Sequence, residues 1–224
     1  MDYPDVELGM IVELPLNLDS APFLTPVRNG KCALEILYGR MEKIVPLKDI
    51  VFLAGHDDGH IPYGNFVAEK GLFLFRTHEV FVSTRLMRAA ASRRMKTIIR
   101  INACHTFADP ELLTGMLEMH KQSNSGFTWM EGAPAWLGGE IFGSGELIDS
   151  HLIAETEGRI SEQPGDVLRT RLNEYKFATY KPAGRRRWKN INLSLADRSS
   201  AALVYEAIRR APDPMTVTLR DFQD

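Results

Sequence analysis

The 224-residue sequence is poor in cysteine, in net charge and in long apolar runs, and each shortage excludes a class of protein. Its two cysteines, Cys32 and Cys104, give neither a disulfide framework nor zinc-site spacing, which fits a reducing compartment. A formal net charge of −2 gives no general attraction to nucleic acid or anionic membranes. No stretch approaches the roughly 20 apolar residues of a membrane-spanning helix, and the acidic N-terminus lacks a signal-peptide pattern. We therefore expect a cytoplasmic protein without a nucleic-acid or membrane partner.

Residues 96–120, KTIIRINACHTFADPELLTGMLEMH, predict a buried parallel strand followed by a helix. The β-branched run 97–101 suits the interior of a parallel sheet. Asp109 is a good helix N-cap, Pro110 suits the first turn, and Glu111 suits the positive end of the helix dipole. Loops that leave the carboxyl ends of central parallel strands hold the ligands of α/β proteins. We therefore expect a ligand near residues 102–106.

Strand and helix patterns alternate along the first half of the chain, which predicts βαβ units. The second half is less regular and suggests an antiparallel excursion. The expected fold is α/β, with a mostly parallel central sheet, helices on both faces, and one domain over residues 1–224. The expected strands are 10–14, 49–54, 72–75, 97–101, 127–130, 140–142, 177–180, 191–193 and 215–219. The expected helices are 31–43, 63–70, 79–94 with Val80 facing inward, 109–120, 144–154, 166–175 and 199–210.

Three local clusters suggest chemistry, and each has a plainer alternative. His56, His60 and the two aspartates between them could bind a divalent metal, or could form a solvated turn. Cys104 and His105 invite a nucleophile–base interpretation, although a buried cysteine more often acts as a small hydrophobe. The basic run 185–189, RRRWK, could bind a phosphate or could be a solvated turn.

Taken in order, these elements resemble the CMP-sugar synthase type of cytidylyltransferases, including the spore-coat polysaccharide and acylneuraminate branches. Residues 49–90 follow the family's strand, polar loop, helix, "G-V-x-V-F-R-G" strand and next helix. Residues 99–120, IRINACHTFADPELLTGMLEMH, follow "V-R-I-T-x-D-x-P-x-x-D-P-x-L-I", and residues 134–142, PAWLGGEIF, follow "P-x-G-x-x-V-E-V-F". The resemblance covers nearly the whole chain and implies a Rossmann-like nucleotidyltransferase sheet of the glycosyltransferase A type.

The chain also departs from the family's catalytic pattern. The family's basic phosphate loop, "R-x-G-S-x-R-L-P-G-K", is replaced by residues 14–24, LPLNLDSAPFL, which hold no basic residue. The metal-binding aspartate after the central strand falls on Cys104, and the second falls near Leu193, or on Asp197 if the loop differs. Nucleotidyl transfer needs cations and Mg²⁺ around the phosphates, and a thiol is a poor ligand for Mg²⁺. The resemblance therefore implies degenerate catalytic motifs.

These observations lead to one expectation of function and one alternative. The first is a non-catalytic binding or scaffolding module, with a nucleotide, a nucleotide-sugar, a protein or a second copy as candidate partner. The alternative is an active sugar nucleotidyltransferase or glycosyltransferase with a rearranged, Mg²⁺-dependent metal site.

The candidate site residues, by role, are nucleotide-binding Asn17, Ser20, Asn102 and Thr106, sugar-pocket Trp136 and Glu140, metal-binding Asp109 and Asp197, and catalytic Cys104 and His105. We expect Trp136 to fill part of the sugar pocket, because the family keeps a glycine there. We also expect the apolar residues of loop 17–24 to pack onto the protein or a partner instead of holding phosphate.

Overall fold

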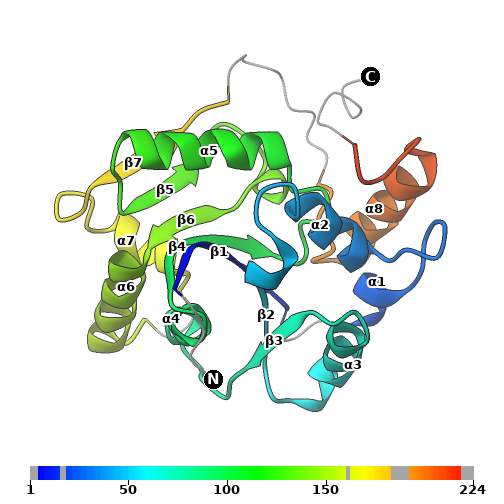
Figure 1. Ribbon diagram of the computed structural model, residues 1–224, viewed down its shortest axis with the longest axis horizontal. Coiled ribbons are helices and arrows are strands. Elements are labelled where there is room, and N and C mark those ends of the chain that lie inside the picture. The colour runs from blue at the N-terminus through cyan, green and yellow to red at the C-terminus, as the bar shows by residue number, and fades with distance from the viewer. Residues whose placement is uncertain (1–4, 16–18, 160–161, 183–191, 218–224) are drawn as a thin grey trace.

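A computed structural model describes residues 5–15, 19–159, 162–182 and 192–217 (Figure 1). Its sheet has seven strands in the order β3-β2-β1-β4-β6-β5-β7. The strands are β1 (Val6–Glu13), β2 (Ile50–Ala54), β3 (Phe73–Arg76), β4 (Met95–Asn102), β5 (Phe127–Met130), β6 (Glu140–Gly143) and β7 (Phe177–Tyr180). The helices are α1 (Ala21–Leu24), α2 (Ala33–Met41), α3 (Ile61–Glu69), α4 (Val82–Ser92), α5 (Pro110–Gln122), α6 (Ser144–Glu157), α7 (Pro164–Arg169) and α8 (Arg198–Arg210).

The strands β3, β2, β1 and β4 form a continuous parallel half of the sheet. Strand β6 runs antiparallel to its neighbours β4 and β5, and β7 pairs parallel to β5 at the far edge. The β-branched run predicted to be interior lies within β4, between β1 and β6, so that prediction is confirmed. The mostly parallel sheet with an antiparallel excursion is also confirmed.

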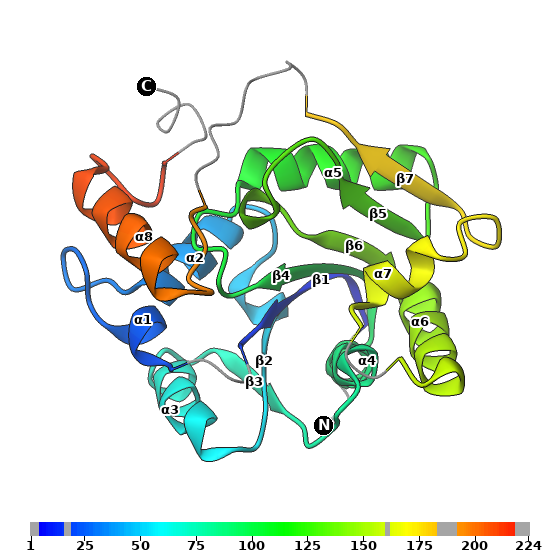
Figure 2. The same cartoon turned by 180° about the vertical axis from the view of Figure 1, so that it is seen from behind.

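Two apolar cores lie on opposite faces of this sheet because successive strand residues point to opposite sides. Met10 and Val12 of β1 belong to the larger core, under α2, α5 and α8, while Ile11 belongs to the smaller core, under α4 and α6. Figures 1 and 2 show α5 and α6 on opposite sides of the strands, as predicted. No helix in the described part of the chain is long and apolar enough to cross a membrane.

Several predicted boundaries differ from the structure. The helix expected from residue 79 begins at Val82, and Val80, which was expected to face inward, is 70% exposed. Residues 77–81 form a loop instead, in which Thr77 Oγ1 accepts a hydrogen bond from the Glu79 N–H at 3.1 Å. The helix expected over 166–175 ends at Arg169, because the chain then continues through turns.

The sequence also predicted strands over residues 191–193 and 215–219. Of these, residues 192–193 and 215–217 are described and are not strands. Residues 191, 218 and 219 lie outside the described residues. Asn17 and the basic run 185–189 lie outside them as well.

Candidate functional site

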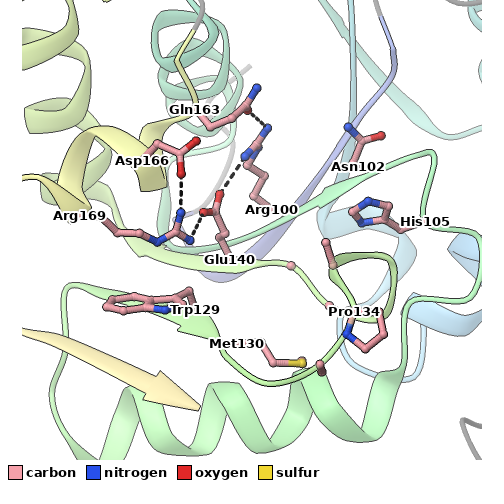
Figure 3. Close-up of a pocket in the computed structure, with 14 residues that line it drawn as sticks. Arg100, Asn102, His105, Trp129, Met130, Pro134, Glu140, Gln163, Asp166 and Arg169 are labelled. Atoms are coloured by element: carbon pink, nitrogen blue, oxygen red, sulfur yellow. Dashed lines mark hydrogen bonds and ion pairs between the residues drawn. The ribbon is translucent and has the colours of Figure 1, made fainter. Parts of the chain in front are cut away.

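A pocket of about 300 Å³ opens beside the carboxyl end of β4 (Figure 3). Strand β4 contributes Arg100 and Asn102, β5 contributes Trp129 and Met130, and β6 contributes Glu140. The rest of the wall comes from the loop after β4, the segment before β6, and α7: His105, Ala133, Pro134, Ala135, Gly138, Gly139, Gln163, Asp166 and Arg169. The pocket therefore lies where the parallel half of the sheet meets its antiparallel part.

Arg100 is held between two carboxylates in the floor of this pocket. Its guanidinium lies 2.5 Å from Glu13 Oε2 and 2.8 Å from Glu140 Oε2, and it also donates to Gln163 Oε1. Burial opposes the positive charge, but the two carboxylates outweigh burial and hold the pKa of Arg100 above its ordinary value. The two carboxylates therefore fix Arg100 in place as a permanent cation.

Arg169 extends this network onto an aromatic wall. Its guanidinium lies 2.5 Å from Asp166 Oδ1 and 3.1 Å from Glu140 Oε1. It also lies over the ring of Trp129, 5.3 Å from the ring centroid, which is within the range of a cation–π interaction. One side of the pocket is therefore charged, while Trp129, Met130 and Pro134 make the other side apolar (Figure 3).

The loop after β4 has a fixed geometry. Asn102 Oδ1 accepts the Cys104 N–H at 2.8 Å, and the Asn102 carbonyl accepts the His105 N–H at 2.9 Å. Cys104 is 4% exposed, and burial raises the pKa of its thiol to about 12, with a further rise from Glu13. His105 lines the pocket, and burial lowers its pKa to about 4. At neutral pH the thiol is therefore protonated and the imidazole is uncharged, which does not favour an activated nucleophile–base pair.

The two candidate metal-binding aspartates both cap helices. Asp109 is 5% exposed, and its Oδ1 accepts the backbone N–H groups of Glu111 and Leu112 at the start of α5. Asp197 accepts the Ser200 N–H and the hydroxyls of Ser199 and Ser200 at the start of α8, and these bonds lower its pKa to about 2.

Other potential metal ligands are also dispersed. His60 is bonded to Asp57 Oδ2 at 2.8 Å and to the Pro15 carbonyl at 2.9 Å, while His56 stacks on His78. Within residues 5–15, 19–159, 162–182 and 192–217, no three His, Cys, Asp or Glu side chains are placed to hold a metal ion.

The loop between β1 and α2 packs against the protein where it is described. Phe23 is fully buried and lies edge-on to Tyr63, and the Pro22 carbonyl accepts the Tyr205 hydroxyl at 2.8 Å. The expectation that this loop buries its apolar residues is thus confirmed for Phe23. Ser20 lies at the start of α1 without a side-chain capping bond. Further along, Arg28 donates to the carbonyls of Ile208, Arg209 and Ala211 at the end of α8.

Several buried polar groups near this end of the sheet lack a hydrogen-bond partner. Among the described residues these include Tyr63 Oη, Ser83 Oγ, His105 Nδ1, Thr106 Oγ1 and all three guanidinium nitrogens of Arg85. Tyr63 lies in the first turn of α3, and Ser83 and Arg85 lie in the first turn of α4. His105 and Thr106 lie in the loop that follows β4. Buried polar groups normally have hydrogen-bond partners, so these atoms are exceptions among the described residues.

Some predicted site residues meet at the pocket and others do not. Asn102, His105 and Glu140 line it, whereas Cys104, Thr106 and Trp136 are buried and are not among its lining residues, although Ala135 beside Trp136 is. The sequence interpretation missed Arg100, Trp129, Gln163, Asp166 and Arg169. Arg100 carried a signal, because it is the charged residue within the β-branched run 97–101 of the central strand. The others carried none, because only the folding of β5 and α7 brings them to β4.

Comparison with known proteins places this geometry in context. No protein-family model matches the chain. The chain is 26% identical over 148 residues to the spore coat polysaccharide biosynthesis protein SpsF of Bacillus subtilis strain 168. That match spans 65% of this chain and 62% of the relative, less than two thirds of the relative's length.

Solved structures show the same fold. A cytidylyltransferase from Leptospira borgpetersenii serovar Hardjo-bovis matches with a TM-score of 0.78 at 13% identity, over 97% of this chain and 92% of that one. CMP:2-keto-3-deoxy-manno-octonic acid synthetase complexed with CTP matches with a TM-score of 0.61 at 10% identity, over 91% and 97% of the two chains. The 2-C-methyl-D-erythritol 4-phosphate cytidylyltransferase of Thermus thermophilus matches with a TM-score of 0.61 at 14% identity, over 92% and 100%.

The seven-stranded sheet order, the sequence match to SpsF and the structural match to cytidylyltransferases agree with one another. The chain has the α/β nucleotidyltransferase fold and is a cytidylyltransferase-like protein related to SpsF.

Proposed function

We propose that this protein is a binding module that keeps the cytidylyltransferase fold without nucleotidyl transfer, and that its pocket holds a saccharide unit, free or carried on a nucleotide. The observation that carries the proposal is at Cys104. The resemblance assigns this position to a metal carboxylate, and here it holds a buried thiol with a pKa of about 12. A neutral thiol neither neutralises phosphate charge nor binds Mg²⁺ well.

The surroundings of Cys104 support the absence of transfer. The Leu195 N–H donates to the Cys104 carbonyl at 2.9 Å, so the segment leading to Asp197 lies beside the central loop, where the second metal carboxylate is expected. Asp197 is occupied there as a helix cap. The described part of the phosphate loop supplies buried Phe23 and acidic Asp19 in place of cations, and a like charge near phosphate is repulsive.

The pocket supports saccharide binding. Sugar rings present apolar faces and hydroxyl edges, and this pocket pairs the apolar wall of Trp129 with the charged and amide groups of Arg100, Glu140 and Gln163. Its volume of about 300 Å³ lies at the lower end of the usual range for small-molecule sites. His105 also lines the pocket and adds a polar ring to its wall.

Calorimetric titration of CTP with Mg²⁺ at low salt, followed by a pyrophosphate-release assay over several acid sugars, tests the absence of transfer. We expect no turnover and a CTP dissociation constant weaker than about 10 μM. Clear turnover would overturn the proposal and favour the alternative of an active nucleotidyltransferase with a rearranged metal site.

A second titration tests the pocket itself. We expect a CMP-linked acid sugar, or the free sugar, to bind the wild-type protein, and Trp129→Ala and Arg169→Ala each to weaken that binding at least tenfold. Arg171→Ala is the matched control, because Arg171 pairs with Glu157 and Glu174 away from the pocket. Equal effects of Arg169→Ala and Arg171→Ala on binding would show that this pocket does not bind the saccharide.

A further inference from the structure

We infer that a second groove, at the opposite end of β4 from the saccharide pocket, binds a small amino dicarboxylate. The groove has a volume of about 610 Å³. It is lined by Thr97, His120, Lys121, Asn124, Ser125, Gly126, Gly143, Glu146 and Lys176. Thr97 lies near the beginning of β4, whereas Arg100 and Asn102 of the saccharide pocket lie near its end, so the inference does not rest on the proposed function.

Backbone hydrogen bonds hold the walls of this groove together. The Gly126 N–H donates to the Lys176 carbonyl at 2.7 Å, and the Gly143 N–H donates to the Gly126 carbonyl at 2.7 Å. The Ser125 N–H donates to the His120 carbonyl at 3.0 Å, which ties the same turn to the end of α5. Three segments far apart in the sequence therefore present their side chains from one fixed frame.

Glu146 supplies the negative charge of the groove. It lies in the first turn of α6, where the helix dipole stabilises an anion. A Cβ at Gly126 would clash with Glu146 Oε1, and a Cβ at Gly143 would clash with Glu146 Oε2. The two glycines therefore leave the space that the carboxylate occupies.

Two lysines line the same groove as Glu146. Lys121 and Lys176 line the groove from α5 and from the residue before β7, and neither is in an ion pair with any described residue. Lys181, at the other end of β7, is paired with Glu131 at 3.1 Å. Two unpaired cations and one anion match a ligand with two carboxylates and one ammonium group.

The uncharged lining fits a small, strongly polar ligand. The groove has no apolar side chain among its lining residues, unlike the pocket beside Trp129. His120 is 6% exposed, its Nδ1 is bonded to Thr128 Oγ1 at 2.9 Å, and its Nε2 has no partner among the described residues. Nε2 and the hydroxyl of Thr97 are therefore available to a polar ligand, while an aromatic or lipid ligand finds no surface to bury against.

Titration of the full chain with L-glutamate at low salt tests the inference, with glutarate as the probe that lacks the ammonium group. We expect L-glutamate to bind with a dissociation constant below about 1 mM. Glu146→Gln should weaken L-glutamate binding at least tenfold without weakening glutarate binding. Lys176→Gln should weaken both.

The matched controls are Glu155→Gln, on the exposed side of α6, and Lys181→Gln, beyond β7. Neither control should change binding, because neither residue lines the groove. Absence of L-glutamate binding at about 10 mM would overturn the inference. So would equal binding by wild type and Glu146→Gln, whose near-isosteric side chain keeps the packing against the two glycines.

Discussion

Arg85 is a buried cation whose environment does little to stabilise it. It is 1% exposed, its guanidinium makes no hydrogen bond to a described residue, and burial lowers its pKa despite the nearby charge of Glu13. Keeping such a charge out of water without hydrogen bonds is costly. The buried guanidinium of Arg85 therefore lowers the stability of the fold.

Replacing Arg85 with methionine should therefore stabilise the protein. Methionine keeps much of the volume and removes the buried charge, so we expect the free energy of unfolding to rise by about 1–3 kcal/mol. Urea denaturation at pH 7 measures the change. Arg88→Met is the control on the same helix, because Arg88 is exposed and paired with Glu79. A loss of stability in Arg85→Met larger than in Arg88→Met would contradict the prediction.

The low pKa of His105 makes stability depend on pH. Its folded-state pKa of about 4 lies below the unfolded value of about 6.5. Between these two values the unfolded chain binds more protons than the folded one, so stability falls as the pH falls through this window.

Replacing His105 with glutamine should remove that part of the pH dependence. Because His105 is partly accessible, we expect wild type to lose about 1 kcal/mol more than His105→Gln between pH 7 and pH 5. Urea denaturation of both proteins at the two pH values provides the measurement. Parallel losses would show that the imidazole titrates normally in the folded protein.

At the scale of elements, the strongest local patterns gave the most accurate predictions. The β-branched run of β4, the Asp-Pro-Glu start of α5 and the Asp197 cap of α8 all lie where the sequence placed them. The errors occurred where local pattern was weak. Val80 fits an apolar helical face by spacing, yet residues 77–81 form a loop, and the polar residues after Arg169 turn instead of continuing the helix.

Helix capping by Asp109 leads to a prediction that separates its structural role from metal binding. Asp109→Ala removes the acceptor for the first N–H groups of α5 and should cost about 1–2 kcal/mol of unfolding free energy. Asp109→Asn retains the acceptor oxygen and should stay within about 0.5 kcal/mol of wild type. Urea denaturation with and without Mg²⁺ measures both. A stabilisation by Mg²⁺ that is lost in Asp109→Asn would indicate a metal ligand instead of a cap.

At the scale of the whole molecule, Glu140 joins the two halves of the sheet. It lies on β6, pairs with Arg100 on β4 and with Arg169 on α7, and lies directly opposite Arg100 in the strand register. The sequence interpretation named Glu140 for the sugar pocket, and it does line the pocket. The ionic network itself was beyond sequence reasoning, because its members become neighbours only when β6 inserts antiparallel between β4 and β5.

Loss of Glu140 should therefore affect stability and ligand binding together. Glu140→Ala leaves Arg100 with Glu13 and Arg169 with Asp166, so each cation loses one of two carboxylates, and we expect a destabilisation of about 3 kcal/mol. Glu157→Ala, which removes an exposed carboxylate with two arginine partners, should cost less than about 1 kcal/mol.

The double variant Arg100→Met with Glu140→Leu sharpens this test. Removing both charges leaves no cation stranded between strands, so the double variant should regain part of the stability lost in Glu140→Ala. It should still fail to bind the saccharide, because the polar floor of the pocket is gone. Stability by urea denaturation and binding by calorimetry thus give separate results. Full ligand affinity in the stable double variant would show that the pocket recognises its ligand without this network, and that the network serves only to hold β6 in the sheet.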